Sequence, residues 1–298
     1  MDHLPFRPRV ARRLTLATKV ATAIARDGHF IHLDYPPASG NKSRWGYGQP
    51  PHARLSQLLG QHDEEYREVL SRFEAYSDQF LDIPVEQVSS REPHWRNGFL
   101  FGLDGVSLYG FTRERAPQRY VEIGSGNSTL FVDRARRDGD MPTKIISIDP
   151  YPRREIDEIC DGAIREPLEN ADLRIFSDLR AGDIVFFDGT HRVFMNSDVT
   201  VFFLDVLPEL PPGILIGIHD IHLPYDYRPE HADRYCSEQY LLAAYLLGEP
   251  SWMRPVLPCW YVSHHLELGG RVSALTPWGD LPENPHGVIF WLQTEPRR

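Results

Sequence analysis

The 298-residue sequence has little cysteine, an excess of negative over positive charge, and no long apolar run. Its three cysteines, Cys160, Cys236 and Cys259, are odd in number and far apart, which argues against a disulfide framework and a Cys-x-x-Cys metal site. A formal charge of −10 argues against a nucleic-acid or anionic-membrane partner. No stretch approaches the roughly 18 apolar residues of a membrane span, and the basic N-terminus lacks the apolar block of a secretory signal. We therefore expect a cytoplasmic protein that binds neither nucleic acid nor membrane.

The chain length allows one large domain or two modest ones. We predict a helical N-terminal extension over residues 1–91 and the main domain over 92–298. In the extension, an Ala-rich apolar stripe from Val10 to Ile24 favours a packed helix over a membrane-surface helix, and 62–80 is amphipathic. Between them, 36–51 is rich in Pro and Gly and reads as a loop, with a lid over the substrate as an alternative.

Beyond residue 92, short apolar runs alternate with helical patterns, which predicts an α/β fold with a doubly wound, mostly parallel sheet. The predicted strands cover residues 119–123, 144–149, 162–168, 183–188, 214–218, 255–262 and 287–293. The predicted helices include 104–112, 151–160, 171–179, 196–207 and 238–247. The run 214–218 is so apolar that both of its faces must be buried.

The first of these strands ends in the most informative motif, Arg119-Tyr-Val-Glu-Ile-Gly-Ser-Gly-Asn-Ser-Thr129. Gly124 and Gly126 would let the backbone approach a nucleotide-like ligand at the end of the strand. The motif lacks the third small residue of a dinucleotide fingerprint. It adds Glu122, whose carboxylate would repel a pyrophosphate and attract a cation such as the amino group of an amino-acid tail.

About twenty residues later, the second strand ends in Asp149, where an acid can accept the hydroxyls of a ribose. A ligand with a ribose, a cationic tail and no phosphate is S-adenosylmethionine. The two carboxylates together predict that this compound is the cofactor.

From about Glu92 to Gln293 the sequence resembles the class I methyltransferases that use S-adenosylmethionine, in particular a bacterial branch with Glu-Ile-Gly-Ser-Gly-Asn-Ser-Thr and His-Asp-Ile motifs. The resemblance implies a Rossmann-like, seven-stranded sheet whose last strand is antiparallel. It also implies a cofactor site that includes Asn127, Ser128 and Asp188, and an adenine partner that is left open among Glu169, Asn170 and Asp172.

Four polar residues follow the fourth and fifth strands and should converge on the methyl donor: Asp188, His191, His219 and Asp220. Methyl transfer to an oxygen requires alignment of the acceptor and removal of its proton, by a base or with help from a metal. Resemblance to metal-dependent O-methyltransferases makes Asp188, His219 and Asp220 candidate ligands of a divalent metal. Because those enzymes usually carry an acid where this chain has His219, the ion could be Mg, Mn or another metal.

The leading hypothesis is therefore O-methylation of a small-molecule acceptor, such as a sugar or a natural-product scaffold. The sequence leaves open whether the protein forms a homo-oligomer, whether it uses a metal and which acceptor it methylates. The pocket for the acceptor could include Tyr225, Asp226, Tyr227 and Trp252. An NAD-dependent oxidoreductase and a metal-dependent hydroxylase on a similar fold are the alternatives.

Overall fold

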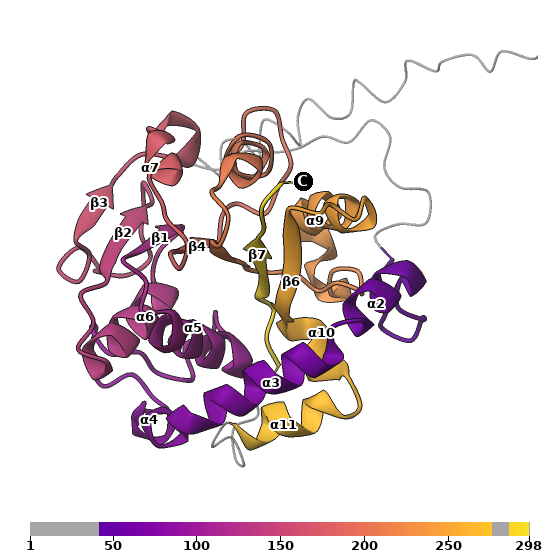
Figure 1. Cartoon of the computed structure of the whole chain (residues 1–298), viewed down its shortest axis with the longest axis horizontal. Coiled ribbons are helices and arrows are strands. Elements are labelled where there is room, and N and C mark those ends of the chain that lie inside the picture. Colours follow the sequence, from indigo (N-terminus) through magenta and orange to yellow (C-terminus); the bar gives the residue numbers. More distant parts are fainter. Residues whose placement is uncertain (1–41, 276–285, 298) are drawn as a thin grey trace, which may run out of the picture. The chain divides into compact units, whose positions relative to one another are not determined.

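A computed structural model describes residues 42–275 and 286–297, and residues 42–298 form one compact unit (Figure 1). The predicted helix between Val10 and Ile24 lies outside the described residues. No helix in the described part is long and apolar enough to span a membrane. All three cysteines are free thiols.

The centre of the fold is a seven-stranded sheet with the strand order β3-β2-β1-β4-β5-β7-β6. Its strands are β1 (Arg119–Ile123), β2 (Lys144–Ile148), β3 (Gly162–Ile164), β4 (Ile184–Phe187), β5 (Leu215–Ile218), β6 (Met253–Pro258) and β7 (Phe290–Thr294). Strands β1 to β5 pair in parallel, whereas β7 pairs antiparallel with both β5 and β6. The doubly wound sheet and its antiparallel last strand confirm the predicted fold class.

Helices cover both faces of the sheet (Figure 1). They are α2 (Ala53–Gly60), α3 (Asp63–Phe73), α4 (Ser77–Asp82), α5 (Gly102–Arg115), α6 (Asn127–Asp138), α7 (Arg174–Ser177), α8 (Asp198–Val201), α9 (Glu238–Leu247), α10 (Cys259–His264) and α11 (Leu268–Ala274). Short 3-10 turns occupy Glu74–Tyr76, Leu168–Asn170, Leu207–Glu209 and Pro229–Arg234, and a π-helical segment occupies Phe202–Val206.

The sheet separates two hydrophobic cores because successive side chains of a strand point to opposite faces. In β1, Tyr120 joins one core with residues of α3 to α6, α10 and α11. Val121 and Ile123 join the other core with residues of α2, α7, α8 and α9. The buried β4 strand alternates in the same way, which explains why its sequence is apolar throughout.

Helices α2 to α4, which precede residue 92, contribute buried side chains to these two cores. For example, Leu59 of α2 and Phe73 of α3 are fully buried. The predicted boundary between residues 91 and 92 stays a prediction, but this part of the extension shares its hydrophobic contacts with the main domain.

Two predicted elements are wrong. Residues 151–160 form bends and turns instead of a surface helix, because only Ile156 of this charged stretch is fully buried and the backbone of Tyr151 is bonded to the side chain of Asp149. The predicted strand 255–262 ends at Pro258, and Cys259 begins α10. The predicted strand 162–168 and helix 171–179 exist in shortened form as β3 and α7.

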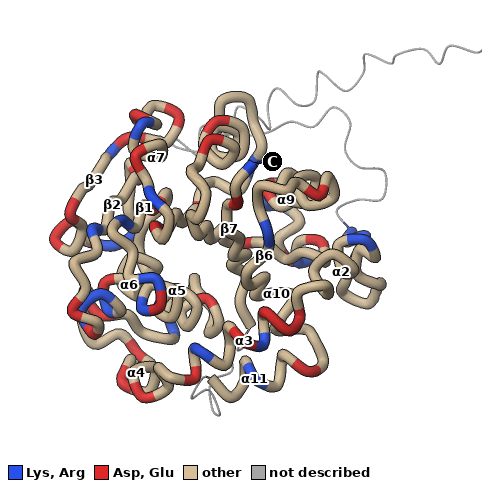
Figure 2. Tube along the Cα trace, viewed as in Figure 1, with Lys and Arg blue, Asp and Glu red and all other residues tan. Residues whose placement is uncertain are grey.

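Charges of both signs are interspersed along the described chain (Figure 2). On α6, Asp133 pairs with Arg136 and Arg137 at 2.6 and 3.0 Å, and Arg134 pairs with Asp138 at 2.9 Å. Exposed ion pairs three or four residues apart on a helix contribute only a few tenths of a kcal/mol each, whereas Asp133 is a buried acid held by two arginines. The carboxylates that matter for function are instead those buried at the ends of the strands.

Candidate active site

The glycine turn after β1 is held closely against the neighbouring strands. Gly124 has a φ of +78°, and a Cβ at this position would lie 1.9 Å from the carbonyl oxygen of Asp188. Its N–H donates to the carbonyl of Ile148, at 3.1 Å. Only glycine fits both the left-handed backbone and the close approach to β4.

Glu122 anchors this turn from beneath. The side chain is fully buried, and its two oxygens accept hydrogen bonds from the hydroxyls of Tyr120, at 3.1 Å, and Thr129. Thr129 in turn accepts the N–H of Gly126 at 3.0 Å. Burial raises the pKa of Glu122 to about 7, although these hydroxyls favour its charged form. A direct contact between Glu122 and the cationic end of a donor stays a prediction, because Glu122 is not among the residues that line the adjacent cavity.

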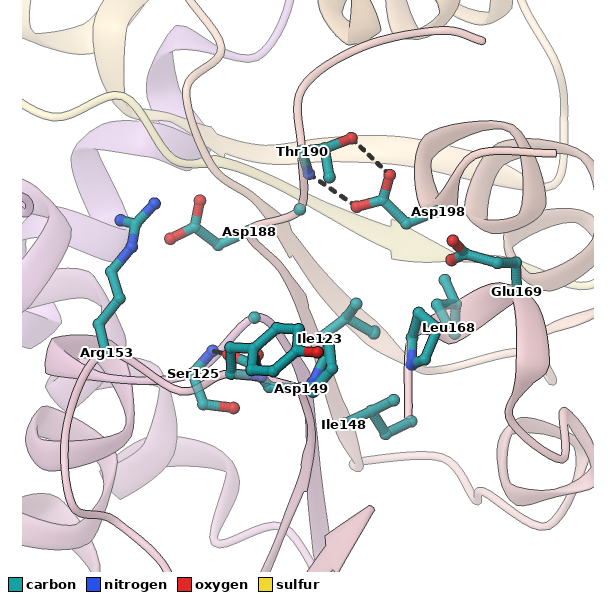
Figure 3. A pocket seen from close by; sticks show the side chains of 15 residues that line it. Ile123, Ser125, Ile148, Asp149, Arg153, Leu168, Glu169, Asp188, Thr190 and Asp198 are labelled. Atoms are coloured by element: carbon teal, nitrogen blue, oxygen red, sulfur yellow. Dashed lines mark hydrogen bonds between the residues drawn. The ribbon is translucent and has the colours of Figure 1, made fainter. Parts of the chain in front are cut away.

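A cavity of about 240 Å³ opens at the carboxyl ends of β1, β2 and β4 (Figure 3). We call it the donor cavity, and its lining consists of Ile123, Gly124, Ser125, Ile148, Asp149, Pro150, Tyr151, Arg153, Pro167, Leu168, Glu169, Asp188, Gly189, Thr190 and Asp198. Three of the predicted cofactor residues line it, namely Gly124, Asp149 and Asp188, whereas Gly126, Asn127 and Ser128 do not. Of the three adenine candidates, only Glu169 reaches the cavity.

Asp149 is fixed at the floor of the donor cavity. One of its oxygens accepts the N–H of Ser125 and the other accepts the N–H of Tyr151, both at 2.8 Å. Each carboxylate oxygen can accept a second hydrogen bond. Asp149 can therefore orient the glycine turn and still accept the two hydroxyls of a ribose.

Asp188 lines the donor cavity and also contacts two of the other predicted catalytic residues. Its Oδ1 lies 3.3 Å from Nδ1 of His219 and 3.4 Å from Nε2 of His191. The same Nε2 of His191 lies 3.3 Å from Oδ2 of Asp220. The structure thus brings all four predicted catalytic residues together, and His191 and Asp220 have left-handed φ values of 63° and 57°.

The electrostatics of this group favour its charged forms. Burial alone would lower the pKa of both imidazoles, but the carboxylates outweigh it and raise the pKa of His191 to about 9 and that of His219 to about 10. Burial alone would raise the pKa of Asp188 and Asp220, but the two histidines hold both below the ordinary aspartate value. At neutral pH the group therefore holds two imidazolium cations between two carboxylates.

Two further buried acids complete this group, and the sequence analysis missed their role. Glu238, the first residue of α9, places Oε1 2.6 Å from Nδ1 of His191. Asp104 of α5 accepts the N–H groups of Phe101, Val288 and Ile289, and its Oδ2 lies 3.9 Å from Nε2 of His219. No local pattern marked either acid, because both helices also bury polar residues such as Ser107 and Gln239.

Among the predicted metal ligands, Nδ1 of His219 lies 3.3 Å from Oδ1 of Asp188 and 3.9 Å from Oδ1 of Asp220. In the described ranges, no group of three or more His, Cys, Asp or Glu side chains is placed to hold an ion. An imidazole binds a metal only in its neutral form, whereas the carboxylates around His219 favour its protonated form. The metal role of Asp188, His219 and Asp220 stays a prediction.

The residues predicted to line an acceptor pocket are not all in one place. Tyr225 lines a second, aromatic cavity of about 390 Å³ with Trp260 and His264. Asp226 is occupied by the backbone N–H of Arg44, at 2.7 Å, and by the hydroxyl of Tyr240. Trp252 packs against Tyr245 instead, with ring centroids 5.8 Å apart.

The strand order, the antiparallel β7 and the glycine turn with acids at the tips of β1, β2 and β4 are those of the class I methyltransferase fold. Residues 121–221 match a family model described as a methyltransferase domain. The match spans β1 to β5 and ends just after Asp220, so it contains the donor cavity and all four predicted catalytic residues.

Solved structures of methyltransferases also resemble the chain weakly. The methyltransferase PaMTH1 of Podospora anserina, bound to S-adenosylhomocysteine, has 16% identity and a TM-score of 0.40, with 99% of this chain and 100% of that chain covered. The O-methyltransferase TomG of Streptomyces achromogenes, bound to S-adenosylmethionine, has 15% identity and a TM-score of 0.41, covering 82% and 99%. An O-methyltransferase of Bacillus cereus has 14% identity and a TM-score of 0.39, covering 82% and 96%.

Such low identities and TM-scores do not indicate a function. The fold is therefore assigned from the strand order and from the family match of residues 121–221. No curated protein matches the sequence.

Proposed function

We propose that this protein transfers the methyl group of S-adenosylmethionine to an oxygen atom of a small molecule. The observation that carries the proposal is the position of Asp188, which lines the donor cavity and also contacts both His191 and His219. A methyl donor in the cavity and an acceptor beside the two imidazoles would therefore meet at this carboxylate.

The donor cavity suits an adenosyl compound. Asp149 would accept the ribose hydroxyls, and the segment from Pro167 to Glu169 would face the adenine ring. When bound, the donor supplies an electrophilic methyl group on a positively charged sulfur. Gly124 allows the turn to pack against the backbone of Asp188, which a side chain at this position would prevent.

His191 and His219 would handle the proton of the acceptor. Their protonated forms are stabilised by Asp188 and Asp220, and a positive charge in the donor cavity would compete for Asp188. The pKa of each imidazole would then fall towards neutrality. One imidazole would lose its proton and could accept the proton of a hydroxyl as the oxygen attacks the methyl carbon. Both ring nitrogens of His219 are buried beside carboxylates, with Nδ1 3.3 Å from Asp188 and Nε2 3.9 Å from Asp104.

Calorimetry with S-adenosylmethionine tests the donor part of the proposal. We expect binding, and we expect Asp149→Ala to weaken it about tenfold or more, because charged hydrogen bonds contribute about 1.5–3 kcal/mol. Asp172→Ala is the matched control, since Asp172 is an exposed acid that pairs with Arg174 and does not line the cavity. An unmodified protein that bound no donor at millimolar concentration would exclude the proposal.

The choice of oxygen as the acceptor atom requires a separate assay. Methyl-labelled donor would be incubated with panels of phenols and sugars and with matched amines and thiols. Label recovered in methyl ethers is the expected result, and label recovered only in amines or thioethers would contradict it.

A further inference from the structure

We infer that Arg153 binds the carboxylate of the amino-acid tail of the donor, so that the site selects a ligand with a complete methionine moiety. This inference deepens the proposed function and depends on it. It concerns a residue that the sequence analysis did not single out, in the bend that replaces the predicted helix 151–160.

The charges around the donor cavity lead to this assignment. The lining contains four acids, Asp149, Glu169, Asp188 and Asp198, and among the described residues that line it Arg153 is the only base. Asp198 is occupied by the backbone and hydroxyl of Thr190, both at 2.6 Å. Asp188 suits the positive sulfur and ammonium groups of the donor, whereas the carboxylate of the donor requires a cation.

Arg153 is free to provide that cation. No carboxylate in the described ranges lies within ion-pair distance of it, although nearby arginines are paired, for example Arg91 with Glu158 and Arg165 with Asp157. Its guanidinium carbon lies 5.0 Å from the ring centroid of Phe99, which restricts the side chain without neutralising its charge.

The position of Arg153 also fits the geometry of the turn. A Cβ built on Gly126 would lie 3.7 Å from the Cγ of Arg154 and 3.8 Å from the Cβ of Arg153, so both arginines lie against the glycine turn at which the amino-acid tail is expected, and of the two only Arg153 also lines the donor cavity. Figure 3 shows its guanidinium on the same side of the cavity as the carboxylate of Asp188, whereas Glu169 lies on the opposite side. The tail and the adenine ring would therefore occupy opposite ends of the cavity.

Two adenosyl ligands separate this role from a general effect on the site. S-adenosylhomocysteine carries the amino-acid carboxylate, and 5′-methylthioadenosine lacks the whole amino-acid group. We expect Arg153→Met to weaken binding of the first about tenfold, the value for one charged hydrogen-bonded contact, and to leave binding of the second unchanged. The affinity of Arg153→Lys for S-adenosylhomocysteine should lie between those of the unmodified protein and Arg153→Met. Lysine keeps the charge but loses the two parallel hydrogen bonds of a guanidinium.

Arg154→Met is the matched control, since Arg154 is the next arginine in the same bend and does not line the donor cavity. It should change neither affinity. Equal losses for both ligands in Arg153→Met, or no loss for either, would overturn the inference while the proposed function stood. If the unmodified protein bound neither ligand, the proposed function would fail and the inference with it.

Discussion

Substitution of Gly124 by alanine is expected to destabilise the protein by about 3 kcal/mol and to abolish donor binding. A methyl group there would overlap the carbonyl oxygen of Asp188, 1.9 Å away, and the φ of +78° is unfavourable for any residue with a Cβ. The turn cannot move away freely, because its N–H is bonded to β2 and its neighbour Ser125 is bonded to Asp149. Urea denaturation followed by circular dichroism measures the free energy of unfolding.

Gly182→Ala distinguishes the cost of a positive φ from the cost of the overlap with Asp188, which act together in Gly124→Ala. Gly182 has a φ of +97°, but a Cβ at this position would meet no atom within 4 Å. Its substitution should cost only the backbone strain, about 1 kcal/mol, and should leave the donor cavity intact. Equal stability losses in the two variants would show that β4 accommodates a side chain at the turn, and the close packing would then not explain the glycine.

The strand tips were the most predictable part of the site. A parallel sheet brings the carboxyl ends of its strands to one edge, so the sequence alone predicted that Asp149 and Asp188 lie near the glycine turn and that Asp220 lies beside His191 and His219. Periodicity also identified the apolar face of the segment after Asn196, where Val199, Phe202 and Phe203 are buried as expected.

The less predictable features depend on contacts between distant segments. Glu238 contacts His191 across 47 residues, and no local pattern indicates that the first turn of α9 reaches the end of β4. The function of Glu122 was also only partly accessible. The sequence identified an acid at the turn, but not that Thr129 and Tyr120 would occupy its oxygens.

The bend after Asp149 escaped prediction for a similar reason. Its backbone follows the rim of the donor cavity and is held by the side chain of Asp149, just after β2, which places Arg153 beside the cavity. Helical periodicity is weak evidence where a short charged segment has a single buried residue.

The second large effect is expected from Glu238→Gln, which removes the charge that faces His191. Both side chains are almost completely buried, and their atoms lie 2.6 Å apart. Loss of one partner leaves the other charge buried without compensation, which typically costs about 3–5 kcal/mol. We expect a loss near the lower end, because Asp188 and Asp220 still face the other nitrogen of His191. Glu249→Gln is the control, since it breaks an exposed ion pair with Arg54 and should cost less than about 1 kcal/mol.

The dependence of this loss on pH distinguishes an ion pair from simple packing. The pKa of His191 is lowered by burial but raised more strongly by its carboxylates, from 6.5 to about 9. Because folding raises the pKa of His191, the stabilisation that its protonated form contributes is complete below pH 6.5. This stabilisation disappears as the pH rises through about 9. Glu238 has its own pKa raised by burial to about 7, so both partners are charged between about pH 7 and pH 9. The difference in unfolding free energy between the unmodified protein and Glu238→Gln should therefore be large at pH 8 and smaller at pH 10. A difference that stayed constant over this range would mean that Glu238 acts through its shape, and the charged group around Asp188 would have to be reconsidered.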